Sequence, residues 1–172
     1  MAKFWRCEIC GDCYIGEKPP SNCPFCGAHQ KYFKTAKIAK ADFDVELNEK
    51  DLANAEHALA VEVSNSTFYF CAAKKTDDEE GKLLFKALGK VELEHATIWK
   101  KILKNAGIPA GNDACHTANK ENLEDSHARE TKAIEFYAKA AGESADPRIK
   151  QIFIALVEVE TDHLHLSEER LK

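Results

Sequence analysis

Six side chains of the kinds that bind metals recur in this 172-residue sequence at a constant spacing. A glutamate is followed by a Glu-x-x-His motif, and the same arrangement returns 68 residues later. The first copy consists of Glu62, Glu92 and His95, and the second of Glu130, Glu160 and His163. Aromatic neighbours keep the offset, since the pair at 68–69 recurs at 136–137. The repeat predicts two equivalent halves of one site.

The spacing places these side chains on the inner face of helices. Phe85, Leu88 and Glu92 follow steps of three and four residues, so the apolar residues mark the face that also carries His95. Four glutamates in a helical core are untenable alone, because each buried charge has a large desolvation cost. Two divalent cations would neutralise them, as in di-iron and di-manganese carboxylate bundles. A carboxylate-rich set favours Fe or Mn over structural Zn.

Other residues near these motifs have two interpretations each. A single glutamate of this kind is usually a solvated residue of an amphipathic helix, and we interpret Glu94 and Asp162, which point about 100° away from the adjacent histidines, as solvated or supporting residues. Tyr69 and Tyr137 lie two turns beyond the glutamates of the first and third predicted helices. Each is either a core aromatic residue or a hydrogen-bond donor to a metal-bound carboxylate.

Two Cys-x-x-Cys motifs lie near the start of the chain, with twelve residues between them. Their members are Cys7, Cys10, Cys23 and Cys26. Four thiolates in two such pairs bind one tetrahedral metal, either Zn or a single Fe. A zinc ribbon therefore stays an alternative. A glycine after each pair, Pro24 and the aromatic Trp5, Tyr14 and Phe25 resemble the corresponding features of a rubredoxin.

The remaining cysteines and histidines carry weaker signals. The odd total of seven cysteines and the paired motifs favour metal binding in a reducing compartment over disulfides. Cys13 competes with Cys10 as a ligand, and Cys10 is preferred. Cys71 is interpreted as a core residue of a helix. The others are interpreted as loop or surface residues, namely Cys115, His116, His29, His57 and His165.

Four stretches after residue 47 have helical periodicity with start and stop signals. Asn48 and Asp146 are the expected caps of the first and fourth helices, and residues 76–79 form a capping-box pattern before the second. The expected ranges run from Asn48 to about Lys75, from Thr76–Glu79 to Asn105–Gly107, from Asn119–Asn122 to Gly142, and from Asp146-Pro147 to the C-terminus.

The longest connection, residues 107–118, separates the second and third predicted helices. One long crossover is the ferritin-like variant of the four-helix bundle, so the fold is predicted to be mainly α. Residues 1–35 should form a rubredoxin-like module, 36–47 a linker, and 48–172 the ferritin-like bundle. Ile38 and Phe43 are the expected anchors of the linker on a neighbouring surface.

Composition and charge exclude several functions. The net charge of −5 and the scattered lysines give no basic surface for nucleic acid. No apolar run approaches the roughly 18 residues of a membrane helix, and the start lacks the apolar segment of a secretory signal, so we expect a cytoplasmic protein. No Gly-x-Gly-x-x-Gly motif follows a strand, so nicotinamide binding is not expected.

A rubredoxin-like module joined to a bundle with these ligands resembles rubrerythrin, in the "reverse" type that carries the module first. The resemblance implies a non-haem di-iron peroxidase for oxidative-stress defence, which reduces hydrogen peroxide to water. Oxygen stays open as a second substrate. Electrons would pass through the four-cysteine iron from an external NAD(P)H-dependent reductase or a rubredoxin-type donor. A homodimer is also implied. We expect it to be head-to-tail or domain-swapped, because the short linker is not expected to bring the two centres together within one chain.

One departure from the family affects the mechanism. Many rubrerythrins carry a further glutamate a turn beyond the third-helix ligand, where it exchanges with a histidine, whereas this chain has Ala133 and Ile134. His127 is the nearest substitute, although a partly buried helix histidine is the simpler interpretation.

Two rival functions stay open. One is a ferroxidase or iron-handling protein with structural zinc at the cysteines, and the other is an electron carrier or peroxide sensor without turnover.

Overall fold

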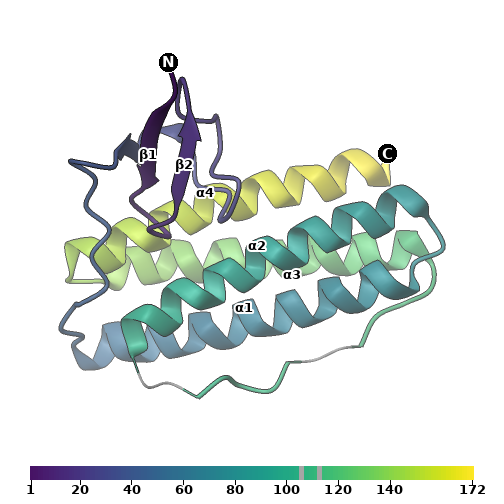
Figure 1. Ribbon diagram of the computed structural model, residues 1–172. Helices are drawn as coiled ribbons and strands as arrows, with labels where there is room; N and C mark the ends of the chain where they lie inside the picture. The colour runs from purple at the N-terminus through teal and green to yellow at the C-terminus, as the bar shows by residue number, and fades with distance from the viewer. Residues whose placement is uncertain (105–106, 112–113) are drawn as a thin grey trace.

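The computed structural model describes residues 1–104, 107–111 and 114–172. This part of the chain forms four long helices and a small three-stranded sheet that stands on one side of them (Figure 1). The helices are α1 (Glu49–Lys75), α2 (Glu79–Leu103), α3 (Asn119–Glu143) and α4 (Pro147–Leu171). The strands are β1 (Lys3–Cys7), β2 (Cys13–Gly16) and β3 (Phe33–Thr35), and a short 3₁₀ helix spans Gln30–Tyr32. The predicted mainly α fold class is confirmed.

Side-chain caps set the start of α1 and of α4. Asn48 Oδ1 accepts a hydrogen bond from the amide of Asp51 at 2.8 Å. Asp146 Oδ1 accepts from the amides of Arg148 and Ile149, and Pro147 occupies the first helical position, where no amide donor is needed. The sequence predicts both starts correctly.

The predicted capping box at Thr76 is wrong. Asp78 is the cap of α2, and its Oδ1 accepts from the amide of Gly81 at 2.5 Å. Thr76 instead ends α1, because its own amide donates to the carbonyl of Ala72 and its hydroxyl contacts Asn119 Oδ1. The Thr76 hydroxyl is thus directed to Asn119 and not to the first turn of α2. The predicted end of α2 at Asn105–Gly107 lies partly outside the described residues, and the helix itself ends at Leu103.

The helices pack as two antiparallel pairs, α1 with α2 and α3 with α4, whereas α1 and α3 meet along a looser seam. The connection from α2 to α3 runs back along the bundle beside α1 (Figure 1). It approaches α1 closely at Gly111, where an added Cβ would lie 2.0 Å from Thr67 Oγ1. None of the helices in the described ranges combines the length and apolar character of a membrane span.

A disulfide joins this connection to α1. Cys71 and Cys115 are bonded, with 5.9 Å between their Cα atoms, although they are 44 positions apart in the sequence. The expectation that the cysteines favour metal binding over disulfides is therefore wrong for this pair, and the interpretations of Cys71 as a core residue and Cys115 as a loop or surface residue did not include the bond. The pairing depends on the path of the crossover over α1, which the spacing of the cysteines does not reveal.

The linker is anchored by one of its two predicted residues. The Phe43 ring lies between two cations, 5.1 Å from Lys101 Nζ and 5.4 Å from the Arg148 guanidinium carbon, which is a cation–π arrangement. Phe43 also packs against the core shared by module and bundle. Ile38 is 64% exposed, so its predicted anchoring role is wrong.

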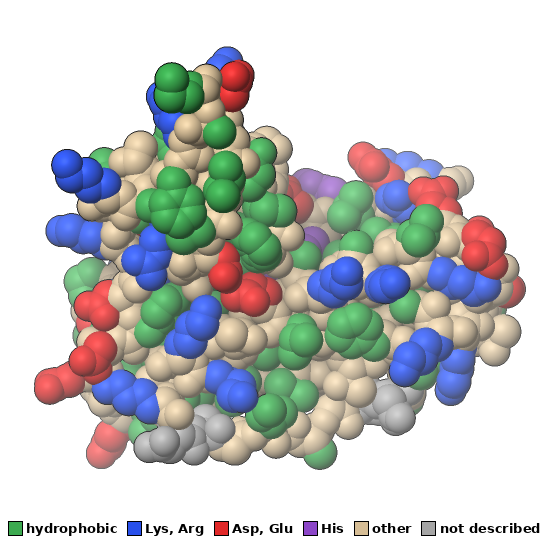
Figure 2. Space-filling model, viewed as in Figure 1, with side chains coloured by type: hydrophobic (Ala, Val, Ile, Leu, Met, Phe, Trp, Pro, Cys, Tyr) green, Lys and Arg blue, Asp and Glu red, His purple; other side chains and the backbone are tan. Residues whose placement is uncertain are grey.

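The sheet module is built around β1, which pairs antiparallel with β2 on one side and with β3 on the other. It rests on the bundle through long cationic side chains: Lys101 Nζ donates to the carbonyl of Cys10 at 2.9 Å, and Arg148 Nη2 donates to that of Ile9 at 3.1 Å. Figure 2 shows the module projecting from the helices, with histidine side chains in the notch between it and the far end of the bundle. Module and bundle share one continuous buried core.

Candidate metal centres

The four cysteines of the paired motifs converge in the module. Each of Cys7, Cys10, Cys23 and Cys26 is buried, and their Sγ atoms all lie within 4.8 Å of one another. The sulfurs of Cys7 and Cys26 are 3.8 Å apart, as are those of Cys10 and Cys23. Four sulfurs at such separations are the ligand set of a tetrahedral metal, which suits either Fe or Zn.

The backbone turns beyond each pair bring the sulfurs together. Gly11 and Gly27 have φ angles of +87° and +73°, in the left-handed region that glycine adopts without strain. Their amides donate to the carbonyls of Cys7 and Cys23, at 3.0 and 2.9 Å. The amide of Asp12 also points at Cys10 Sγ, at 3.4 Å. The Asp12 amide favours negative charge on the Cys10 sulfur, as a bound metal requires.

The sulfurs also shift one another's acidity. Hydrogen bonding with Cys10 is the main cause that lowers the pKa of Cys7. Conversely, hydrogen bonding with Cys23 raises the pKa of Cys10. Cys13, the competing ligand in the sequence, is exposed in β2 and stays outside the group. The geometry therefore favours Cys10 as the sequence does.

A second group of ligand-type side chains lies at the centre of the bundle. It consists of two overlapping sets, Glu62, Glu92, His95 and Glu160 in one, and Glu92, Glu130, Glu160 and His163 in the other. Within each set the ligand atoms lie within 4.8 Å of one another. Each helix contributes one glutamate, and the second and fourth add a histidine. Because Glu92 and Glu160 belong to both sets, they could serve as ligands in both halves of a two-cation site.

In the bundle group, the histidine nitrogens lie close to the carboxylate oxygens, and the side chains are buried. His95 Nδ1 is 3.2 Å from Glu160 Oε1 and 3.5 Å from Glu62 Oε2. His163 Nδ1 is 2.8 Å from Glu160 Oε2 and 3.1 Å from Glu92 Oε1. The four glutamates and His95 are fully buried, and His163 is 6% exposed.

Many polar atoms of this core have no hydrogen-bond partner among the residues that the structure describes. They are Glu62 Oε2, Glu130 Oε2, both carboxylate oxygens of Glu92 and of Glu160, and Nδ1 of His95 and His163. Leaving buried carboxylate oxygens unpaired is costly, and so many in one place call for a shared partner. All of these atoms are carboxylate oxygens or imidazole nitrogens. They fit a pair of divalent cations of the Fe or Mn type.

The pKa shifts of glutamates in this group and of His95 also favour a bound cation. Burial raises the pKa of Glu62 and of Glu130 well above its usual range. Burial also acts on Glu92, but the imidazoles of His163 and then His95, which lie close to its carboxylate, outweigh it and lower the pKa. For His95, the effect of burial is outweighed by the Glu62 charge, which raises the pKa. The carboxylates thus favour any positive charge placed among them.

Two buried tyrosines fix the outer carboxylates across the bundle. Tyr137 on α3 donates to Glu62 Oε1 on α1 at 2.5 Å, and Tyr69 on α1 donates to Glu130 Oε1 on α3. The Tyr69 hydroxyl also contacts Ser126 Oγ at 2.9 Å. Burial raises the pKa of both tyrosines, so each keeps its proton and acts as a donor. The sequence leaves each tyrosine either as a core aromatic residue or as a hydrogen-bond donor to a carboxylate ligand. These contacts favour the donor interpretation.

The two groups are connected by a single hydrogen bond. His95 Nε2 lies 2.9 Å from the carbonyl oxygen of Cys26. The carbonyl is an acceptor, so Nε2 carries the proton and Nδ1 is left to face the carboxylates. One ring thus touches both groups within one chain. The expectation that the linker keeps the two centres apart is wrong.

The acidic residues next to the histidines help to hold the module. Asp162 accepts a hydrogen bond from His29 Nε2 at 2.8 Å and lies 3.3 Å from Asn22 Nδ2. Glu94 is half-buried, and burial followed by the neighbouring Asp12 raises its pKa to about 7. Both therefore contact the module, and of the two interpretations of these residues the contacts favour the supporting one over the solvated one. No sequence signal pairs His29 with a residue 133 positions away.

The other candidate residues stay apart from the bundle group. His127 faces Glu168, with 3.4 Å between Nε2 and Oε1, and does not replace the absent glutamate. Ala133 is buried at the place where that glutamate was looked for. His116 pairs with Asp125 and Glu121, the His57 ring contacts Phe136, and His165 is exposed.

A bundle of two helix pairs with a carboxylate and histidine core, joined to a four-cysteine module, defines a ferritin-like protein with a rubredoxin-like domain. The comparisons agree. The rubrerythrin family model matches residues 53–170, and the model of the rubrerythrin rubredoxin-like domain matches residues 5–34. The chain therefore belongs to the rubrerythrin family, with the rubredoxin-like domain at the N-terminal side. Comparison with curated proteins finds no match.

Proposed function

We propose that this protein is a non-haem di-iron peroxidase that reduces hydrogen peroxide to water and receives its electrons through the four-cysteine site. The observation that carries the proposal is the hydrogen bond from His95 Nε2 to the carbonyl of Cys26. A ligand-type residue of one centre touches a ligand-type residue of the other. Such a contact brings the two ligand sets close together, which electron transfer between them requires and metal storage does not.

Each group of residues has a separate role in this proposal. Glu92 and Glu160 would contribute to both iron sites, together with Glu62 and His95 in one set and Glu130 and His163 in the other. When bound, the di-iron pair supplies the two electrons that convert hydrogen peroxide and two protons into two molecules of water. The four cysteines would hold a single iron, which would supply one-electron transfer.

Hydrogen bonds within the protein orient the ligands of the two bundle sets. Tyr69 and Tyr137 orient the outer glutamates through their hydroxyl protons. His95 keeps its proton on Nε2, so its Nδ1 is free for iron. We also propose an external NAD(P)H-dependent reductase or rubredoxin-type protein as the donor and a homodimer as the assembly, both by analogy with the family.

A stopped-flow experiment tests the peroxidase. The iron-loaded protein is reduced and mixed with hydrogen peroxide, and the visible absorbance of the four-cysteine iron is followed. We expect the oxidised spectrum to return rapidly in the wild type and slowly in Glu92→Ala, because the variant loses the carboxylate shared by both sets. The matched control is Glu135→Ala, which removes an exposed glutamate of α3 and should react like the wild type.

The rival ferroxidase function predicts different results. In that case peroxide leaves the spectrum unchanged, while ferrous iron and oxygen give a mineral product. Metal analysis gives a second readout, since the peroxidase requires about three irons per chain, one at the cysteines and two in the bundle. Zinc at the cysteines of the purified protein would favour the rival.

A further inference from the structure

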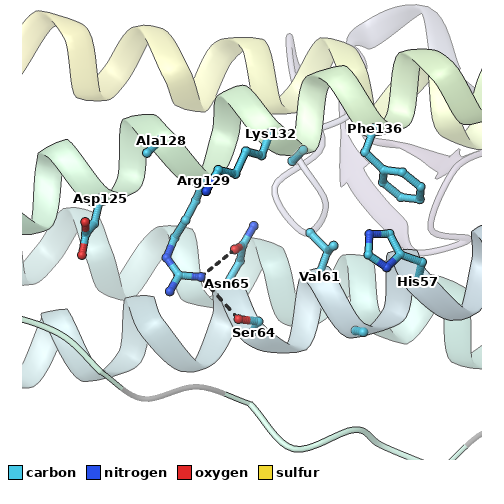
Figure 3. A pocket seen from close by; sticks show the side chains of 11 residues that line it. His57, Val61, Ser64, Asn65, Asp125, Ala128, Arg129, Lys132 and Phe136 are labelled. Atoms are coloured by element: carbon cyan, nitrogen blue, oxygen red, sulfur yellow. Dashed lines mark hydrogen bonds between the residues drawn. The ribbon is translucent and has the colours of Figure 1, made fainter.

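A cavity of about 540 Å³ lies in the seam between α1 and α3. Figure 3 shows Arg129 reaching from α3 toward Ser64 and Asn65 on α1, with His57 and Phe136 at the other end of the cavity. These helices carry Glu62 and Glu130, whereas the cysteine module rests on contacts with α2 and α4. The cavity is therefore separate from the surface that receives the module.

The Arg129 guanidinium is positioned by contacts with α1 and keeps N–H donors that form no hydrogen bond within the described residues. Its Nη1 lies 3.2 Å from Asn65 Oδ1 and 3.3 Å from Ser64 Oγ, and its guanidinium carbon is 4.3 Å from the centre of the Phe68 ring. A guanidinium has five N–H donors, and Nη1 provides only two of them. Within the described residues, neither Arg129 nor the adjacent Lys132 forms an ion pair with a carboxylate.

Asn65 supplies a second unused donor. The residue is only 3% exposed, and its Nδ2 has no hydrogen-bond partner in the described part of the chain. Its Oδ1 is occupied by Arg129, which orients the amide so that the NH₂ group faces elsewhere. A buried amide without a partner is costly, so an acceptor from outside the chain would relieve it.

The rest of the lining is largely apolar. Phe136 meets the His57 ring edge to face, with ring centres 4.5 Å apart, and Val61 and the buried Ala133 lie between this pair and the polar end. Asp125 is the one acidic residue of the lining, and its Oδ2 is 3.1 Å from His116 Nε2. The cavity thus joins a cationic, donor-rich end to an apolar end.

We propose that this cavity binds a small organic carboxylate with an apolar body. The carboxylate accepts hydrogen bonds from the free Arg129 donors and from Asn65 Nδ2, with Lys132 adding positive charge at the rim. The apolar body lies against Val61, Ala133 and Phe136. The proposal does not rest on the reaction of the metal centres, because its donors are not members of the two bundle ligand sets.

Isothermal titration of the full-length, metal-loaded protein with benzoate tests this site. We expect saturable binding with one site per chain. The Asn65→Leu substitution keeps the bulk of the side chain but removes the Nδ2 donor, so it should weaken benzoate binding. Arg129→Met should weaken it by about tenfold or more, because a hydrogen bond to a charged group contributes roughly 1.5–3 kcal/mol. Arg129→Lys should fall between Arg129→Met and the wild type, since it keeps the charge without the fork of donors.

Matched controls separate this site from general binding. Lys150→Met removes an exposed cation of α4 and should leave benzoate binding unchanged. Benzyl alcohol lacks the charge and acetate lacks the ring, so both should bind more weakly than benzoate. Circular dichroism checks that each variant keeps its helices.

Several outcomes would overturn the proposal. They are no binding of benzoate, equal binding by the Arg129→Met variant, or equal binding of benzyl alcohol or acetate. Binding that disappears as the protein concentration rises would also overturn it, because a second copy of the chain would then cover the seam.

Discussion

Tyr69 and Tyr137 exchange their hydrogen bonds across the bundle, each donating to the glutamate of the other helix. The sequence places each tyrosine on the face of its own helix's glutamate and predicts no crossing. A tyrosine two turns along a helix is too far from that glutamate, whereas the opposite helix brings the other carboxylate within reach. The contact is set by helix packing, which periodicity alone does not give.

Removing one of these hydroxyls should weaken metal binding. In Tyr137→Phe, Glu62 loses its donor, so we expect the affinity of the bundle for iron to fall by about tenfold or more, as for other residues that support metal ligands. Competition with a chelator measures this affinity. Tyr14→Phe in the module is the matched control. An unchanged affinity in Tyr137→Phe would show that Glu62 needs no orientation.

At the scale of elements, the sequence predicts the four helices well because their periodicity and caps are local signals. Asn48 and Asp146 cap as expected, whereas the start of α2 is set two residues later than the Thr76 pattern predicts. The crossover is harder to predict. Its length indicates the ferritin-like topology, but its path beside α1 and the bond between Cys71 and Cys115 depend on tertiary packing.

The disulfide should contribute to stability by restraining the unfolded chain. For the 44-residue separation between Cys71 and Cys115, the chain-entropy relation gives about 4 kcal/mol. We therefore expect Cys115→Ser to lower the thermal midpoint by roughly 10 °C in a chain of this size. Calorimetry measures the shift.

A reductant separates this effect from other consequences of the substitution. It should lower the midpoint of the wild type but not that of Cys115→Ser. Cys13→Ser, which removes an exposed free cysteine, should behave like the wild type in both conditions. If reductant leaves the wild-type midpoint unchanged, the disulfide does not stabilise the fold.

At the scale of the whole molecule, the module is seated on the bundle by side chains from distant parts of the sequence. His29 and Lys31 contact Asp162 and Glu158 of α4 on one side, and Lys101 and Arg148 contact the cysteine loops on the other. These contacts place Cys26 against His95 within one chain. The geometric reason for a head-to-tail dimer is thereby removed.

Mixing two inactive variants tests this arrangement. Glu92→Ala removes a bundle carboxylate and Cys23→Ser removes a sulfur of the module, so each chain keeps one intact centre. If each module serves the bundle of its own chain, mixtures refolded together should not recover the peroxide-driven reoxidation. Recovery of activity in the mixture, with both variants inactive alone, would indicate that modules serve the bundle of a second chain. Wild-type protein refolded in parallel is the control.

The contact between His95 and Cys26 also makes the two halves of the repeat unequal. His95 is fully buried under the module, while its counterpart His163 retains 6% exposure. Two cations held by nearly identical ligands would therefore differ in how readily they leave. We expect the one beside His163 to exchange first with metal in solution, so that a half-exchanged, mixed-metal centre can be prepared from a sequence that is itself nearly symmetric.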